Sequence, residues 1–219
     1  TGSTLKQCEL VELVRICHRR DLALIADEVF SDYVDAPDPR RAPSVAACDD
    51  VLTFTLNGLS KVAGLPQLKL GWIVVNGPDD AVHEAVARLE FLADLYLSVA
   101  TPVQRALLEL LELAGGLQEQ IRDRVRANRA FLCDRLGAVS PVSALPAEGG
   151  WYALLRVPRI VADEQLVLTL LGRFDTLVQP GYFFDIPVDG VVVASLLTEP
   201  DAFRNGVARL LNCVETLEV

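Results

Sequence analysis

The sequence is poor in the features that mark nucleic-acid-binding, membrane and secreted proteins. Its 20 Lys and Arg are outnumbered by 30 Asp and Glu, which gives a net charge of −10. Nucleic-acid binding needs clustered basic residues that neutralise phosphates. No unbroken apolar run reaches the roughly 18–20 residues of a membrane span, and no basic segment followed by an apolar one marks a secretory signal. We therefore expect neither nucleic acid nor a membrane as a partner.

Histidine and cysteine are scarce as well. The two histidines, His18 and His83, are not part of an H-E-x-x-H pattern, so the sequence predicts no metal site. The five cysteines are odd in number, widely scattered and without a C-x-x-C pair. Cysteines with this distribution are expected to be reduced and to pack as small, buried apolar side chains. They favour a cytoplasmic location.

The remaining composition is that of a globular protein, with 51% hydrophobic and 23% charged residues. Apolar runs rich in β-branched residues predict strands at residues 51–56 and 72–75, and the wholly apolar run 22–26 predicts a strand covered on both faces. Strands that alternate with helices favour a parallel sheet in the first part of the chain. A helix ending at Arg20 is expected to begin with a cap at Ser3 or Thr4.

Three helices are predicted between Pro78 and Leu136. One helix follows Pro78, with an apolar face made by Val82, Ala85, Val86, Leu89, Ala93 and Tyr96. Two further helices are expected on either side of a stop at Gly115-Gly116. Beyond Ser140 the predicted strands are 151–155, 176–178 and 191–197, and the predicted helices are 163–172 and 201–217.

Residues 58–72, between two of these predicted strands, are the most distinctive stretch. They read Gly-Leu-Ser-Lys-Val-Ala-Gly-Leu-Pro-Gln-Leu-Lys-Leu-Gly-Trp, a loop punctuated by glycine and proline that carries Lys61 and Lys69. For an arbitrary loop, two solvated lysines would be a sufficient explanation. The particular order of residues suggests a more specific role.

The stretch resembles the lysine segment of class I/II aminotransferases, fold-type I enzymes that use pyridoxal phosphate. The family pattern S-x-S-K-x-x-G-(L)-P-G-h-R-h-G-W, where h is apolar, is matched at Ser60-Lys61, Gly64, Pro66 and Gly71-Trp72. Residues 22–30 resemble the family strand that ends in D-E-x-Y, and Thr1-Gly2 resembles the end of its N-P-T-G signature. The three segments occur in the family's order.

This resemblance implies a role for five residues. Lys61 would form an imine with the cofactor and move a proton at the substrate Cα. Asp27, at the end of a strand, would keep the pyridine nitrogen protonated, although an aspartate there can also simply cap the next turn. Ser60 and Lys69 would hold the phosphate. Phe30 would lie beside the cofactor, where the family usually has a tyrosine that donates to the phenolic oxygen.

Other positions also depart from the family pattern. Gly58 replaces a common phosphate-binding serine, and Lys69 replaces an arginine, which keeps the charge and loses the bidentate fork. The largest departure is Val193, which stands two residues before Ser195 where the family has an arginine for the substrate α-carboxylate. We expect that carboxylate to be held elsewhere, or to be absent from the preferred amine donor.

The resemblance also implies a fold class and a domain organisation. The class is α/β, with residues 1–100 forming an incomplete large domain of mostly parallel sheet with helices. Residues 101–219 would form a connecting helix and a small α+β domain. Further cofactor-binding segments of the family would lie upstream of Thr1, so this chain is expected to be an inactive C-terminal part of a longer enzyme that forms a homodimer.

The implied function is transamination between an amine donor, an amino acid, and a 2-oxo acid. A pyridoxal-phosphate lyase of the same fold is one alternative, because elimination uses the same lysine and aspartate. A non-catalytic domain of a regulator is another, and an unrelated α/β domain is the last. A visible absorbance band that depends on Lys61 would separate the enzymes from the unrelated domain.

Overall fold

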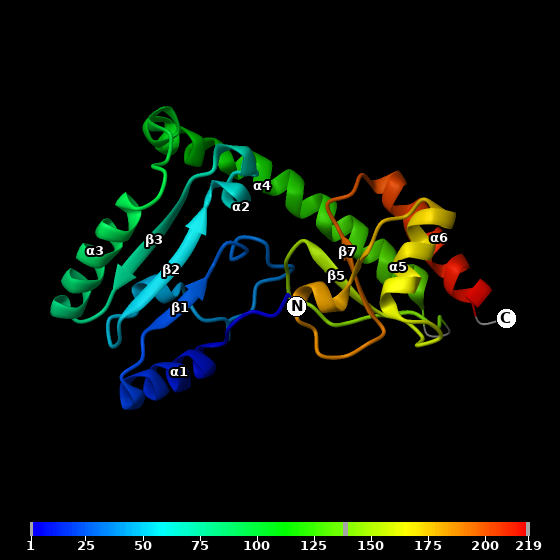
Figure 1. The fold of residues 1–219 in the computed structure, drawn as a ribbon, viewed down its shortest axis with the longest axis horizontal. Coiled ribbons are helices and arrows are strands. Elements are labelled where there is room, and N and C mark those ends of the chain that lie inside the picture. Colours follow the sequence, from blue (N-terminus) through cyan, green and yellow to red (C-terminus); the bar gives the residue numbers. More distant parts are fainter. Residues whose placement is uncertain (1, 138–139, 218–219) are drawn as a thin grey trace. The chain divides into compact units, whose positions relative to one another are not determined.

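The computed structural model describes residues 2–137 and 140–217, which form two compact units (Figure 1). The lysine unit is Thr4–Glu119, and the C-terminal unit holds residues 2–3 and 120–217. The division between them lies inside one long helix. The domain boundary after residue 100 that the sequence suggests stays a prediction.

The lysine unit contains a three-stranded sheet in the order β1-β2-β3. Its strands are β1 (Leu24–Asp27), β2 (Thr53–Gly58) and β3 (Gly71–Asn76). As predicted, β1 and β2 run parallel, but β3 is antiparallel to β2. Strand β3 returns antiparallel because the connection holds only the short helices α2 (Leu59–Val62) and η2 (Pro66–Leu68). A parallel return needs a crossover along one face of the sheet.

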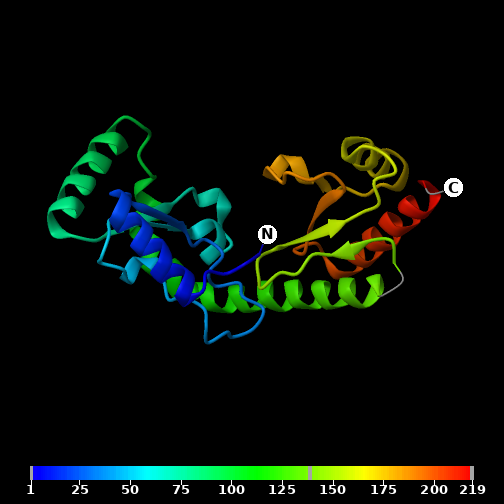
Figure 2. The same ribbon diagram turned by 90° about the horizontal axis from the view of Figure 1, so that it is seen from below.

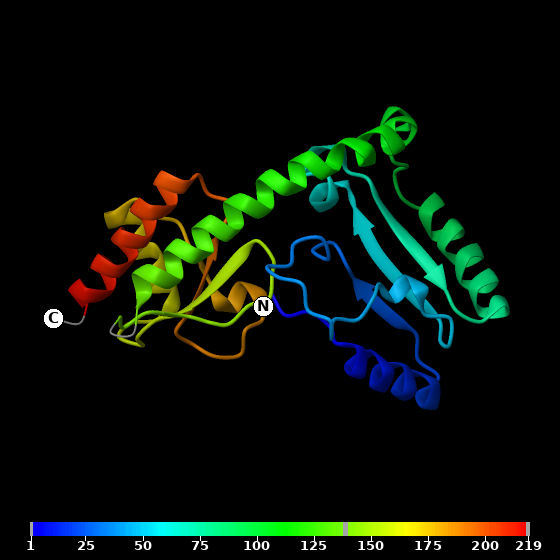
Figure 3. The same cartoon turned by 180° about the vertical axis from the view of Figure 1, so that it is seen from behind.

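The helices of this unit are α1 (Gln7–Arg20), η1 (Val45–Ala47) and α3 (Asp79–Asp94), and α3 lies beside β3 (Figure 3). The cap predicted at Ser3 or Thr4 was wrong, because α1 begins at Gln7 with Lys6 as its N-cap. The Lys6 backbone N–H donates to Glu9 Oε2 at 2.8 Å, which satisfies a donor at the helix start.

Two predicted apolar surfaces are more exposed than expected. Ile25 in β1 is 67% exposed and Leu22 is 53% exposed, so the run 22–26 is not covered on both faces in this structure. On α3 only Ala85 of the predicted face is buried, and Tyr96, just beyond the helix, is 76% exposed.

Helix α4 (Thr101–Leu136) is continuous over 36 residues, so the predicted stop at Gly115-Gly116 was wrong. A glycine inside a helix costs only about 1 kcal/mol, and the flanking leucine, glutamate, glutamine and arginine residues favour helix. A Cβ added at either glycine would meet no atom within 4 Å. Helix propensity on both sides therefore carries the helix through the pair.

The open surroundings of these glycines lead to a stability prediction. Replacing Gly115 and Gly116 together with alanine should raise the free energy of unfolding by about 1–2 kcal/mol, because alanine loses less backbone entropy. Urea unfolding followed by circular dichroism measures this change. Gly190→Ala is the contrasting variant: its φ is +77° and its Cβ would lie 2.9 Å from the Val157 carbonyl oxygen, so it should destabilise. A double variant no more stable than the parent would contradict the prediction.

The C-terminal unit contains an antiparallel sheet in the order β4-β5-β7-β6. Its elements are β4 (Ser143–Ala144), β5 (Tyr152–Arg156), α5 (Asp163–Phe174), β6 (Gln179–Pro180), η3 (Gly181–Phe184), β7 (Val191–Ser195) and α6 (Pro200–Leu217). The C-terminal part of α4 runs along this sheet (Figure 2). Asn128 on α4 donates to the carbonyl oxygens of Leu196 and Thr198, just after β7.

Two details of this sheet differ from the prediction. The strand expected at residues 176–178 is instead β6, immediately after them, and β4 was not predicted. Both strands have two residues, which is too short to produce a recognisable alternation of apolar and polar side chains. Over residues 2–137 and 140–217, no helix combines the length and apolar character that crossing a bilayer requires.

Candidate active site

The candidate site is built at the carboxyl edge of the parallel pair β1 and β2. Asp27 is the last residue of β1 and pairs with Leu56 of β2. Strand β2 ends at Gly58, and α2, which carries Lys61, begins at the next residue. Because parallel strands end at the same edge of a sheet, Asp27 and Lys61 both leave the sheet there, where open α/β sheets bind ligands.

The structure brings Lys61 and Phe30 into direct contact. The Lys61 Nζ lies 5.5 Å from the centroid of the Phe30 ring, within the range of a cation–π interaction. Phe30 belongs to the turn that follows β1, three residues after Asp27. The sequence placed Phe30 beside a cofactor. In this structure its ring supports the ammonium group of the lysine.

Asp27 and its neighbour Glu28 have different surroundings. The Asp27 Oδ1 accepts a hydrogen bond from the Val29 N–H at 3.1 Å, which is the turn-capping contact considered as its alternative role. The Asp27 residue is exposed, so its carboxylate remains accessible. Glu28 instead accepts from the Ser44 hydroxyl and the Val45 N–H, both at 2.7 Å. Of the two carboxylates, Asp27 is the one open to a ligand.

The two predicted phosphate-binding residues lie at different points of the loop. Ser60 is partly buried and precedes Lys61 on α2. Lys69 is exposed at the end of η2, in the left-handed region with φ +51°. The structure therefore keeps Ser60 next to Lys61 and places Lys69 at the opposite end of the loop.

Gly58 has a packing role that explains why no larger residue stands there. A Cβ on Gly58 would lie 3.0 Å from both the Gly71 Cα and the Leu70 carbonyl oxygen. The close approach of β2 and β3 at this point thus favours glycine, because a Cβ would force the facing backbone to shift by a few tenths of an ångström. Gly58 therefore lacks the hydroxyl of the serine found in the family at this position, and it lets the two strands pack closely.

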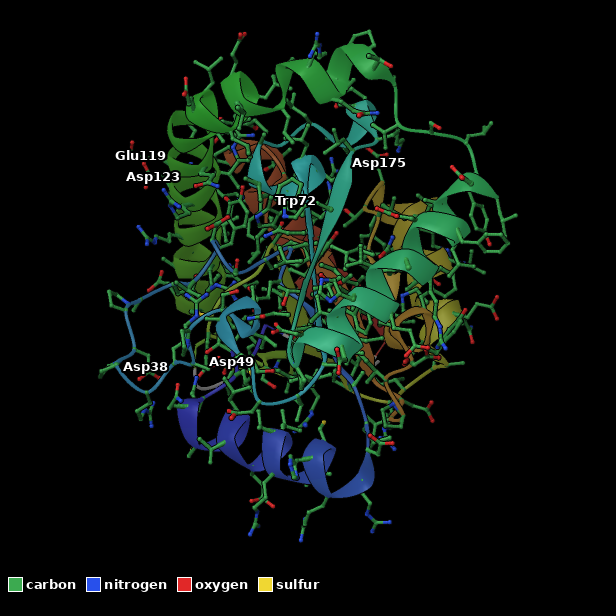
Figure 4. The ribbon with its side chains drawn as sticks, turned by 90° about the vertical axis from the view of Figure 1, so that its left-hand side faces the viewer. Asp38, Asp49, Trp72, Glu119, Asp123 and Asp175 are labelled. Carbon is green, nitrogen blue, oxygen red and sulfur yellow. The ribbon has the colours of Figure 1, made fainter. Side chains whose placement is uncertain are left out.

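The lysine loop is fixed to α4 by an apolar cluster. Leu59, Ala63 and Leu70 are buried together with Ala114 of α4. Trp72, which Figure 4 labels on β3, is among the partly buried residues that pack around this cluster. Removal of these side chains from water stabilises the loop against the helix.

Two further side chains, which the sequence did not indicate as a pair, contact the lysine turn. The Tyr33 hydroxyl donates to the Lys61 carbonyl oxygen at 2.6 Å, and Gln118 Nε2 donates to the Val62 carbonyl oxygen at 2.9 Å. Both partners are far from the turn in sequence, so no local pattern could have revealed these contacts.

Val193, at the position where the family has its carboxylate-binding arginine, is a core residue here. It lies in β7, which has neighbours on both sides, and it is 5% exposed. Its register partners are Leu154 on β5 and Gln179 on β6. The side chain contributes to packing within the C-terminal unit.

The donor set at the edge of the lysine unit fits pyridoxal phosphate. A primary amine suits the aldehyde, an accessible carboxylate suits the pyridine nitrogen, and a hydroxyl and an ammonium each suit a phosphate. These groups are supplied by Lys61, Asp27, Ser60 and Lys69. The site assignments themselves remain predictions.

The sequence matches the family model described as "Aminotransferase class I and II" over residues 1–204. The alanine aminotransferase of Mycobacterium tuberculosis is 30% identical over 191 residues, which cover 82% of this chain and 43% of that protein. The glutamate–pyruvate aminotransferase of Escherichia coli (strain K12) is 29% identical, over 85% of this chain and 47% of that protein. The chain thus spans about half the length of the curated relatives it matches.

Solved structures give the same result for the fold. An aminotransferase from Escherichia coli superimposes with a TM-score of 0.84 at 24% identity, covering 98% of this chain and 55% of that one. A putative aminotransferase from Clostridium difficile 630, solved with bound pyridoxal phosphate, gives 0.81 at 17% identity, covering 97% and 55%. At these identities the likeness shows a shared fold.

Proposed function

Because the chain belongs to the class I and II aminotransferase family, we propose that the whole protein transfers an amino group from an amino acid to a 2-oxo acid, using pyridoxal phosphate bound through Lys61. The observation that carries the proposal is the position of Lys61 at the carboxyl edge of β1 and β2. There its ammonium lies over Phe30, in the turn that begins at Asp27.

Three predictions made from the sequence are confirmed at the level of the family. The chain is a class I/II aminotransferase sequence, its fold is that of these enzymes, and pyridoxal phosphate is the cofactor of the family. The substrates and the partner subunits belong to the proposal.

Each proposed residue has a defined task. The Lys61 Nζ would remove the proton from the substrate Cα. It would then deliver that proton to the cofactor carbon that is bonded to the amino nitrogen. The Asp27 carboxylate would stabilise positive charge on the ring nitrogen, and Ser60 and Lys69 would bind the phosphate. When bound, pyridoxal phosphate supplies the electron sink that makes the substrate Cα acidic.

The proposal is tested by adding pyridoxal phosphate to the complete protein and recording the visible absorbance band. We expect a band that is lost in Lys61→Ala and retained in Lys69→Ala, whose weaker phosphate contact should raise the Kd. Lys69 is a suitable control because it lies in the same loop. A band that survives in Lys61→Ala would reject Lys61 as the residue that binds the cofactor.

Product analysis distinguishes transamination from the lyase alternative. Transamination yields a 2-oxo acid and leaves the nitrogen on the cofactor, whereas elimination releases ammonia. Relatives of this chain are named for pyruvate in combination with glutamate or arginine, so pyruvate is the first 2-oxo acid to assay. Ammonia formed in proportion to the 2-oxo acid would favour a lyase.

We also propose a cytoplasmic homodimer that binds no nucleic acid. The five cysteines are free in this structure, as in a reducing compartment, and the net charge of −10 disfavours binding to phosphates. Large apolar side chains at the end of α3 and beyond are exposed and would be covered by a partner subunit: Phe91, Leu92, Leu95, Tyr96 and Leu97. Sedimentation of the complete protein measures the subunit number.

A further inference from the structure

Helix α2, which carries Lys61, is too short to keep its own conformation. It has only four residues, Leu59–Val62, and is closed by the N–H groups of Ala63 and Leu65, which both donate to the Leu59 carbonyl oxygen. Isolated helices of this length are unstable in water. Within the turn the Lys61 carbonyl oxygen already accepts from the Gly64 N–H, at a long 3.4 Å, so stronger restraint of this end has to come from other parts of the chain.

Two side chains meet consecutive carbonyl groups at this end. The Tyr33 hydroxyl donates to the Lys61 carbonyl oxygen at 2.6 Å, from a side chain that is only 3% exposed. Gln118 of α4 donates from Nε2 to the Val62 carbonyl oxygen at 2.9 Å. One support comes from the turn after β1 and the other from a different helix, so together they restrain α2 from two sides.

The two supports are connected to each other and to the lysine side chain. Gln118 Nε2 also lies 3.2 Å from Asp32 Oδ2, and Asp32 directly precedes Tyr33. Phe30, in the same turn, lies under the Lys61 ammonium at 5.5 Å. The turn at residues 30–33 therefore contacts the backbone and the side chain of the same lysine.

We propose that Tyr33 and Gln118 are positioning residues that hold the backbone of Lys61 and thereby direct its amine. The inference rests on the proposed function for the role of the lysine. The physical argument is that a long flexible side chain reaches a fixed point only if its Cα is fixed. Without either hydrogen bond, α2 should open more often and the ammonium should leave the Phe30 ring more often.

The test uses two variants and two measurements on the cofactor-free protein. Tyr33→Phe removes only a hydroxyl, and Gln118→Ala removes the amide. The first measurement is hydrogen exchange at the Leu65 amide, which reports opening of the turn. The second is reductive methylation of Lys61 relative to Lys69. Each should increase about fivefold, the factor that corresponds to losing one ordinary hydrogen bond.

Matched controls separate positioning from general loosening. Gln104→Ala removes a comparable bond on the same helix, from Gln104 Nε2 to the Val99 carbonyl oxygen at 2.7 Å. Tyr182→Phe removes an exposed hydroxyl in the C-terminal unit. Both controls should leave the Lys61 to Lys69 ratio and the exchange at Leu65 unchanged. Should Tyr33→Phe fail to fold, Gln118→Ala decides the question.

The outcomes separate this inference from the proposed function. If both variants match the controls in exchange and methylation, Tyr33 and Gln118 do not position Lys61, whatever the cofactor does. If exchange at Leu65 and the methylation of Lys61 relative to Lys69 both rise about fivefold, the inference is supported. A visible band that persists in Lys61→Ala would reject the proposed function on its own, while a loosened turn would still support the restraint of Lys61.

Discussion

Replacing Asp27 with asparagine is expected to lower kcat for amino transfer by about 10²–10³-fold, the usual loss when one preorganised charge contact is removed. The proposed role of Asp27 depends on its negative charge, whereas its capping contact depends only on an acceptor oxygen. Asparagine keeps an acceptor for the Val29 N–H, which Asp27 now binds at 3.1 Å. The variant therefore separates the two roles assigned to this residue.

The comparison needs a control carboxylate and a second substitution. Asp49, labelled in Figure 4, is exposed in the connection between β1 and β2, and Asp49→Asn should keep full activity. Asp27→Ala should lose activity like Asp27→Asn, and should lose some stability as well because the cap is removed. Steady-state kinetics and thermal unfolding of the four proteins give the answer. Full activity in Asp27→Asn would leave capping as the only role of this residue.

Local signals in the sequence located the strand that ends at Asp27 and the loop that carries Lys61, and the resemblance to class I/II aminotransferases made them the candidate site. The strand that ends at Asp27 and the loop that carries Lys61 are contiguous stretches, and each has its own apolar run and turn residues. The parallel pairing of β1 and β2 followed from the alternation of strands and helices. These features depend on residues that are close in sequence, so they can be predicted from a single sequence.

Features that depend on distant residues could not be predicted in this way. The hydrogen bonds of Tyr33 and Gln118 to the lysine turn join residues 28 and 56 positions apart. The continuity of α4 through Gly115-Gly116 depends on the summed propensity of a 36-residue helix, in which two glycines are a minor cost. The exposure of Ile25 could not be predicted either, because an apolar run does not indicate which faces of a strand are covered.

Val193→Arg would return an arginine to the position where the family binds the substrate α-carboxylate, and the structure indicates what that substitution costs. Val193 lies between Leu154 and Gln179 on the inner strand β7 and is 5% exposed. An arginine at this position would bring a guanidinium to a point where valine is almost fully buried, and of its two register partners only Gln179 is polar. Burial of an unpaired charge costs several kcal/mol unless partners satisfy it.

We therefore expect Val193→Arg to lower the free energy of unfolding by about 3 kcal/mol or more, without improving the use of carboxylate-bearing amine donors. Ser195→Arg is the matched control, because Ser195 is exposed two residues further along the same strand and should accept the larger side chain at a cost below about 1 kcal/mol. Urea unfolding of both variants measures the costs, and kinetics with glutamate and alanine measure donor use. A stable Val193→Arg protein with improved activity on these donors would mean that position 193 can open toward a substrate. A destabilised protein without improved donor use would support a packing role for Val193 in β7.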